Sequence, residues 1–286
     1  MTALLLAVLG AGLYGGADFL GGLASRRDDW LPVTTYVELV GLVPLAAVAW
    51  LLSTGTPSVE SLGWGLAAGL IGGIGIALLY RGLALGQMSV VAPITGVCAT
   101  VIPVLAGIAF GEHPPVRAIV GIAVAVLAVV LVSQGASHGG ESSTPALATG
   151  SAGAGVVMAL ASGVAIGGFL VLIARAHGNG LWPLLVSRAA ATGLLIALAL
   201  ATHRPVLPKP GVRRTGAWAG IFDTSATVCY ALAVHPGALG IVATLIALYP
   251  AGTLVLARVV LGERLRRRQS IGLICAAGAV VLITSA

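Results

Sequence analysis

Long apolar runs separated by short polar breaks extend along the whole chain. Each run is close to the roughly 20 residues that an α-helix needs to cross the hydrocarbon core of a bilayer. The breaks hold typical helix-ending residues, among them Arg26-Arg27-Asp28-Asp29, Pro114-Pro115 and His235-Pro236-Gly237. The pattern predicts an all-α polytopic membrane protein with ten transmembrane helices, at about residues 3–24, 31–52, 61–80, 90–110, 117–134, 150–174, 181–201, 215–234, 240–261 and 269–285.

The second half of the chain repeats the first at an offset of 151 residues, so that Gly111-Glu112 corresponds to Gly262-Glu263. The repeat predicts two five-helix units, at residues 1–134 and 150–286, joined by a loop at 135–149. Because five is an odd number, the second unit must cross the membrane in the opposite direction. Inverted repeats of this kind are typical of secondary transporters, which bind substrate between the repeats near the middle of the membrane.

The composition excludes an ordinary soluble domain. Of the 286 residues, 58% are apolar and only 8% are charged, whereas a soluble domain carries about a quarter charged residues. The lipid bilayer is therefore the expected surrounding, and a multi-pass protein of the cell membrane, most simply a bacterial inner membrane, is the expected location. The net charge of +6 does not indicate nucleic acid as a partner, because the basic residues lie in short loops.

The loops differ strongly in their basic residues. Eleven Lys or Arg residues lie in or next to the loops after the odd-numbered helices, and two, Arg117 and Arg175, lie near the others. The positive-inside rule then predicts that both termini are outside the cell. Gly22-Leu23-Ala24 resembles a signal-peptide cleavage site, but no basic region precedes the first apolar run. We therefore expect an uncleaved first helix.

Four ionisable residues, Asp18, Glu38, Arg188 and Asp223, lie inside predicted spans. Such groups are costly in lipid, so they tend to face a wet interior and mark function. Glu38 and Arg188 are equivalent at an offset of 150 residues. They predict either an ion pair or a site for the two ends of a zwitterion, and a purely structural salt bridge remains the alternative. Asp18 is either a binding residue or an interfacial acid paired with Arg26, and Asp223 is either a proton or amine acceptor or a paired interior acid.

Aromatic and helix-breaking residues complete the candidate site. The tyrosines expected to contact substrate are Tyr14, one turn before Asp18, Tyr80, Tyr230 and Tyr249. The residues expected to act in hinges or gating are Pro93, Pro103, Pro250 and Arg81, since a proline inside a span frees a backbone carbonyl. Arg81 has a second interpretation, in which it reaches out to the membrane interface.

The chain resembles the ten-helix EamA-type carriers of the drug/metabolite transporter superfamily. The matching motifs are YGGADFLGG at 14–22, LYRGLA at 79–84, SVVAP at 89–93 and LYP at 248–250, together with the two Gly-Glu turns. The resemblance implies export or exchange of small metabolites through a central cavity lined by the first four helices of each half. Members often carry Trp where this chain has Tyr14. Carriers of the wider superfamily are usually drawn with cytosolic termini, contrary to the charge count.

The leading hypothesis is a secondary transporter that moves a small amino-acid-like, amine or similar polar compound by alternating access. An intramembrane enzyme and a channel or scaffold are the alternatives, but the His-Glu-x-x-His motif of metalloproteases is absent from the sequence. No ATP-binding motif is present either, so the driving force is expected to be a gradient of substrate or of protons. Cys98, Cys229 and Cys275 have no metal-ligand spacing, and we expect neither a cofactor nor a metal. The sequence does not indicate an oligomeric state.

Overall fold

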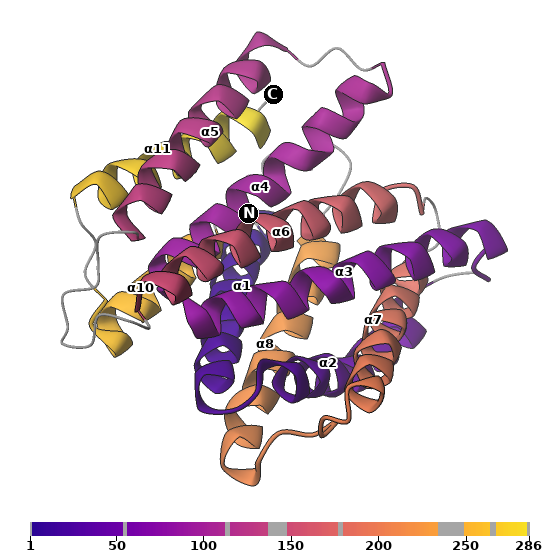
Figure 1. The fold of residues 1–286 in the computed structure, drawn as a ribbon. Helices are drawn as coiled ribbons and strands as arrows, with labels where there is room; N and C mark the ends of the chain where they lie inside the picture. The colour runs from indigo at the N-terminus through magenta and orange to yellow at the C-terminus, as the bar shows by residue number, and fades with distance from the viewer. Residues whose placement is uncertain are drawn as a thin grey trace.

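The computed structural model describes residues 2–53, 56–111, 115–136, 148–176, 180–233, 249–263 and 267–284. Within these ranges the chain is helical, with no strand. The helices, labelled in Figure 1, are α1 (Thr2–Arg27), α2 (Trp30–Leu52), α3 (Val59–Leu85), α4 (Met88–Ala109), α5 (Val116–Ala136), α6 (Ala148–Ile173), α7 (Trp182–Ala201), α8 (Pro210–Ala233), α10 (Tyr249–Leu261) and α11 (Arg267–Thr284).

The all-helical prediction is confirmed over the described residues, and six helices are long and apolar enough to cross a membrane: α1, α2, α3, α4, α6 and α7. Two helices continue past the predicted apolar runs. α3 extends to Leu85 and α8 begins at Pro210, because backbone hydrogen bonding continues where the side chains become polar. Predicted positions 240–248 lie outside the described residues.

The two Gly-Glu turns end their helices in the same way. Gly111 follows α4 with φ of +88°, and Gly262 follows α10 with φ of +67°. An added Cβ would meet nothing within 4 Å at either position, so the left-handed backbone, and not crowding, requires glycine there. The sequence correspondence at an offset of 151 residues therefore has a structural counterpart.

The helix contacts form a pattern that survives exchange of the two halves. α1 packs on α8 and α10, and their counterparts α6, α3 and α4 pack in the same combination. α2 packs on α8 as α7 packs on α3. Three pairs, α2 with α7, α4 with α10 and α5 with α11, map onto themselves. α5 and α11 lie together at one edge of the bundle (Figure 1).

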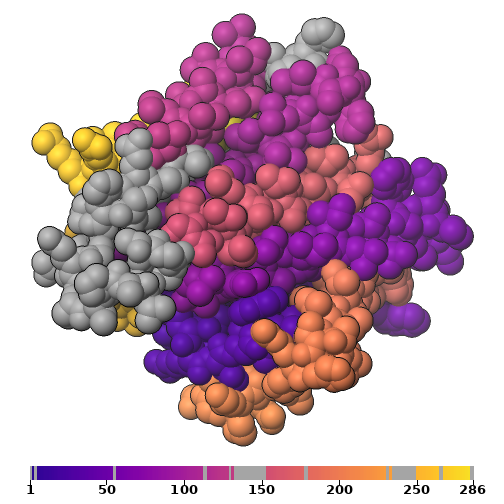
Figure 2. Space-filling model, in the orientation of Figure 1, coloured from indigo at the N-terminus to yellow at the C-terminus, as the bar shows by residue number. Residues whose placement is uncertain are grey.

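The long seam between α3 and the second half depends on small residues. Figure 2 shows α3 and α6 lying side by side across one face of the molecule. On the other side of α3, a Cβ at Gly65 would lie 2.6 Å from the carbonyl oxygen of Pro183, and Gly69 lies against Ser187. These close approaches make the Gly65-x-x-x-Gly69 stretch a packing seam between α3 and α7. Leu66, Leu70 and Ile74 of α3 are exposed, as expected for a helix face in contact with lipid.

Contacts near the helix ends show which ends lie on the same face of the bundle. Arg26, at the end of α1, donates hydrogen bonds to the carbonyl oxygens of Leu83 (3.0 Å) and Gly86 (2.7 Å) at the end of α3. Gly155 near the beginning of α6 also lies against Gly86. α1 and α3 therefore end on the face of the bundle where α6 begins. We call it the Arg26 face.

Glu263, which follows α10, joins the halves at the Arg26 face. Its carboxylate accepts hydrogen bonds from the backbone N–H groups of Met88 (3.2 Å) and Ser89 (3.0 Å) and from the Ser89 hydroxyl (2.7 Å). It also pairs with Arg26 at 3.1 Å. Glu263 thus caps the beginning of α4, a helix 174 residues away along the chain.

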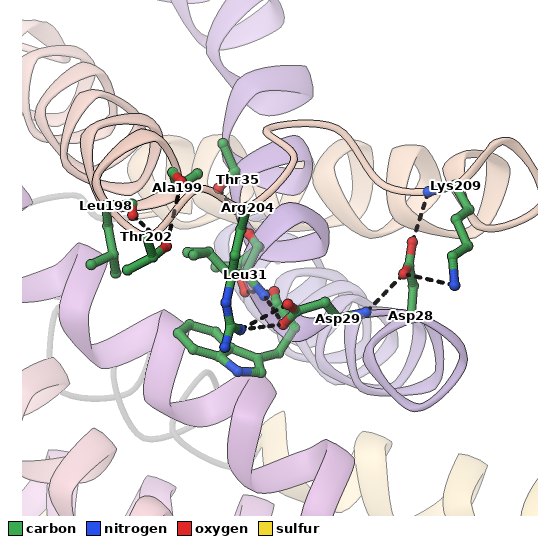
Figure 3. A network of polar contacts seen from close by, with 11 residues as sticks. Asp28, Asp29, Leu31, Thr35, Leu198, Ala199, Thr202, Arg204 and Lys209 are labelled. Carbon is green, nitrogen blue, oxygen red and sulfur yellow. Dashed lines mark hydrogen bonds and ion pairs between the residues drawn. The ribbon is translucent and has the colours of Figure 1, made fainter.

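A second polar cluster at this face joins the α1–α2 turn to the α7–α8 loop (Figure 3). Arg204 pairs with Asp29 at 2.7 Å, and the backbone N–H of Lys209 donates to Asp28 at 2.7 Å. Burial raises the pKa of Asp28, but hydrogen bonds from the Lys209 and Asp29 N–H groups and the charge of Lys209 outweigh it and lower the pKa below its usual range. These contacts hold the ends of α1, α2, α7 and α8 together.

Candidate functional site

A buried arginine joins three helices in the interior of the bundle. Arg188 of α7 pairs through Nε with Oε2 of Glu38 on α2 at 3.2 Å, and through Nη1 with Oδ2 of Asp223 on α8. Its Nε also lies 3.4 Å from the carbonyl oxygen of Glu38. The Arg188 and Glu38 side chains are each 9% exposed. The predicted Glu38–Arg188 ion pair is therefore present, and Asp223 is a second partner of the same guanidinium.

Close helix packing makes this arrangement possible. A Cβ at Gly220 of α8 would lie 2.6 Å from the carbonyl oxygen of Val37 on α2. The Thr224 hydroxyl of α8 donates to the carbonyl oxygen of Gly41 on α2 at 3.1 Å. Gly41 also lies against Nη2 of Arg188. The small residues let α2 and α8 approach closely, which places their two acids on either side of the arginine.

A chain of hydroxyl groups connects this ion cluster to α1. The Thr227 hydroxyl lies 3.0 Å from the carbonyl oxygen of Asp223, which it bonds as donor. The hydroxyl of Tyr14 lies 3.0 Å from the same Thr227 oxygen. Because Thr227 uses its hydrogen on the backbone, Tyr14 is the donor in that contact. Tyr14 therefore belongs to the same polar network as Arg188 and Asp223.

Asp18 is the second charged element of the interior. It lies on α1, at 1.5 Å per residue about 14 Å along the axis from Arg27, and is 6% exposed. Its Oδ2 atom has no hydrogen-bond partner among the described residues. The Asp18 carboxylate lies within electrostatic range of Asp223, Tyr80 and Tyr249. Arg26, the alternative partner for Asp18, bonds Glu263 instead.

Two tyrosines from different halves lie close to this stretch of α1. The ring of Tyr80 crosses α1 at Gly21, one turn after Asp18, and Tyr80 is 1% exposed. The ring of Tyr249 lies 6.1 Å from that of Tyr14, tilted by 60°. α10 approaches here because the Thr253 hydroxyl donates to the carbonyl oxygen of Gly15 at 3.1 Å. The structure thus brings together Asp18, Glu38, Arg188, Asp223, Tyr14, Tyr80 and Tyr249 in one interior region.

The remaining predicted residues lie elsewhere or outside the described part. Pro93 and Pro103 lie inside α4, and Pro250 packs on α4 at Gly96. Arg81 is exposed on α3, with its guanidinium carbon 5.6 Å from the centre of the Trp30 ring. This agrees with the interfacial interpretation of Arg81. For Tyr230 the backbone lies in α8, but its side chain is outside the described residues.

The interior cluster consists of ion-paired side chains and hydroxyl groups. Within the described ranges, no group of three His, Cys, Asp or Glu side chains is arranged to hold a metal ion. The polar groups instead come from α1, α2, α7 and α8, which belong to both halves. An interior site of this composition within apolar helices is typical of proteins that carry solutes across membranes.

The fold and the interior charges define a multi-pass membrane protein of the solute-carrier class. The sequence model of the EamA-like transporter family matches residues 1–134 and 153–285, so the chain belongs to this family. Its members are membrane transporters, which confirms the resemblance drawn from the motifs. A comparison with curated proteins gives no match.

Proposed function

We propose that the protein is a secondary transporter that exports a small metabolite by alternating access between two inverted five-helix repeats. The observation that carries this proposal is the Glu38–Arg188 ion pair at 3.2 Å. It joins equivalent positions of the two halves across a helix pair that maps onto itself. A substrate site formed at this contact is shared by both halves, so a relative movement of the halves exposes it to one face and then to the other.

Three further observations support the inverted arrangement. The most extensive helix contacts between the halves, such as α1 with α8 and α6 with α3, occur in corresponding pairs. α1 ends on the face where α6 begins, because Gly86 contacts both Arg26 and Gly155. The family match falls into two segments, residues 1–134 and 153–285, close to the predicted repeats at 1–134 and 150–286.

In this proposal the substrate is bound by Asp18, Glu38, Arg188 and Asp223, with Tyr14, Tyr80, Tyr230 and Tyr249 around it. Pro93, Pro103 and Pro250 lie where α4 and α10 meet or bend, and they supply flexible points for the movement. Protons are the proposed coupling ion, since the acids of the site alternate between binding a proton and binding partner groups. The protein acts in the cell membrane.

A metabolite-resistance screen tests the function. Cells that express the protein are challenged with toxic amino acids, amines and their analogues, and the protected compounds are then tested for uptake in proteoliposomes. Asp18→Asn, Arg188→Ala and Asp223→Asn are expected to lose protection at equal amounts in the membrane. Asp29→Asn, an acid of the Arg26 face away from the interior, is the matched control and is expected to keep it.

If all three interior variants protect as well as the parent, the proposed site is wrong. If no compound is carried in cells or proteoliposomes, the transporter proposal itself fails. Proton coupling is tested separately: uptake that is unchanged by a pH gradient across the vesicle membrane refutes it.

A further inference from the structure

The charges of the interior do not balance. The described interior holds three acids, Asp18, Glu38 and Asp223, against the single guanidinium of Arg188. All other Lys and Arg residues of the described part are exposed. Among the described residues, therefore, Arg188 is the only cation in the interior.

Arg188 is already occupied by the other two acids. Its Nε bonds Glu38 at 3.2 Å and its Nη1 bonds Asp223. The remaining nitrogen, Nη2, lies against Gly41 and has no hydrogen-bond partner among the described residues. Both ion pairs of Arg188 lie on the α2–α8 side, and Asp18 on α1 is the interior acid without an ion pair among the described residues.

The position of the Asp18 carboxylate suits it to bind a ligand. It is 6% exposed, and Oδ2 has no partner among the described residues. A buried carboxylate that stays ionised without a partner costs several kcal/mol or more, so it is normally neutralised by a cation or a proton. The nearby charge of Asp223 has the same sign, which makes a positive partner for Asp18 more favourable.

The surroundings of Asp18 fit an organic cation. Tyr80 crosses α1 at Gly21, and Tyr249 pairs with Tyr14 one turn before Asp18. Faces of aromatic rings attract ammonium groups, and the attraction is stronger where water is excluded. An acid within reach of tyrosine rings from both halves thus offers a charge contact and cation–π contacts together.

We propose that the transported compound carries a positively charged amine or quaternary ammonium group, which binds Asp18 among Tyr14, Tyr80 and Tyr249. The inference rests on the proposed transport function and narrows its substrate class. A zwitterion fits less well, because it adds no net positive charge to a described interior in which three acids face one guanidinium. An anion would increase that imbalance.

The test compares cations with neutral or zwitterionic compounds of nearly the same shape. The purified protein is heated in detergent with choline or 3,3-dimethylbutan-1-ol, benzylamine or benzyl alcohol, and phenylalanine amide or phenylalanine, and unfolding is followed by tryptophan fluorescence. We expect cations to raise the melting temperature and their partners to leave it unchanged. Asp18→Asn should weaken the binding of an active cation at least tenfold, and Asp18→Glu should restore part of it.

Glu60→Gln is the matched control, because Glu60 is an exposed acid on α3, and it should bind the cation as the parent does. Equal stabilisation by a neutral partner, undiminished binding to Asp18→Asn, or no effect of any cation overturns the inference. Transport measured in proteoliposomes distinguishes a failure of the proposed substrate class from a failure of the transporter proposal. If neutral or zwitterionic compounds are carried and cations are not, the transporter stands and the substrate class is wrong; if nothing is carried, the transporter proposal fails.

Discussion

Replacing Arg188 by methionine tests how strongly the interior ion cluster holds the two halves together. The change keeps most of the apolar volume of the side chain and removes its charge. Glu38 and Asp223 are then left in the interior without a cationic partner. Removing one partner of a buried ion pair typically costs about 3–5 kcal/mol, because the other charge stays buried and unpaired. We expect a loss of this size in the free energy of unfolding.

The second variant removes one of the two charges that the first leaves unpaired, that of Glu38. At 3.2 Å and an effective dielectric constant of about 20, the attraction between Arg188 and Glu38 is about 5 kcal/mol before desolvation is subtracted. The double variant Glu38→Gln with Arg188→Met should therefore be more stable than the sum of the single changes implies, with a coupling energy of up to about 3 kcal/mol.

The exposed Asp29–Arg204 pair is the control for this cycle. Its nitrogen–oxygen distance is shorter, 2.7 Å, but the Arg204 and Asp29 side chains are 45% and 32% exposed. In water the attraction at this distance is only about 1.5 kcal/mol, and side-chain entropy and salt reduce it to below about 1 kcal/mol. If burial, and not distance, decides the strength, the Asp29→Asn and Arg204→Met cycle must give the smaller coupling energy.

The assay is reversible unfolding in mixed micelles, in which helix content is followed as a denaturing detergent is added. All single and double variants are measured at the same ionic strength, and the control cycle is repeated at high salt. Additive effects at Glu38 and Arg188, with a coupling energy no larger than that of the Asp29–Arg204 pair, would refute the conclusion that this cluster joins the halves.

Three further predictions concern packing, pH and orientation. Gly69→Leu should lower the unfolding free energy by about 1–3 kcal/mol, because Gly69 lies against the backbone of Ser187. Gly63→Leu is the control and should be tolerated, because a Cβ at Gly63 would have nothing within 4 Å. Equal losses of stability for the two variants in detergent unfolding would contradict the close packing of α3 on α7 at Gly69. Because the pKa of Asp28 is lowered in the folded protein, its stabilising contribution is present above its unfolded value of about 3.9 and is lost as the pH falls through the folded value. Asp28→Asn should therefore lower stability slightly at neutral pH and not in strong acid, and an equal loss at both would be evidence against it. Lys209 is the only lysine of the chain and its side chain is 77% exposed. If the positive-inside rule holds, a membrane-impermeant amine reagent should label Lys209 in permeabilised cells and not in intact ones, and labelling in intact cells would place the Arg26 face outside.

The helices were predictable from the sequence because lipid imposes a length and a polarity on each span. The positions of Asp18, Glu38, Arg188 and Asp223 inside spans followed from the same rule. The Glu38–Arg188 contact was also predictable, since the offset of 150 residues makes them equivalent, and equivalent residues near a twofold axis lie near each other. Pairing of Asp223 with the same arginine was left open, because no sequence pattern fixes how α8 is rotated about its own axis.

Contacts made by helix ends were the hardest to predict. Glu263 bonds Met88 and Ser89 across 174 residues or more of chain. The glutamate has the composition of a cap, but a sequence does not state which helix a cap serves once the chain has folded. The Asp29–Arg204 pair was hidden for the same reason. Such contacts depend on the relative heights of helix ends, which are set by packing in the interior.

The proposed twofold relation explains why the two repeats differ in charge at their centre. α2 and α7 map onto each other, so a residue on their contact faces the equivalent residue of the other repeat. An unchanged duplicate would bring two glutamates or two arginines together at the Glu38–Arg188 position, with repulsion of the same order as the attraction now present. Opposite charges at 3.2 Å remove that conflict and bind the halves together. Asp18 has no charged counterpart in the second repeat, because the equivalent position in α6 holds Gly168. Asymmetry between the repeats thus has two separate results: a stabilising ion pair at the Glu38–Arg188 position, and an acid that the first repeat alone carries, Asp18.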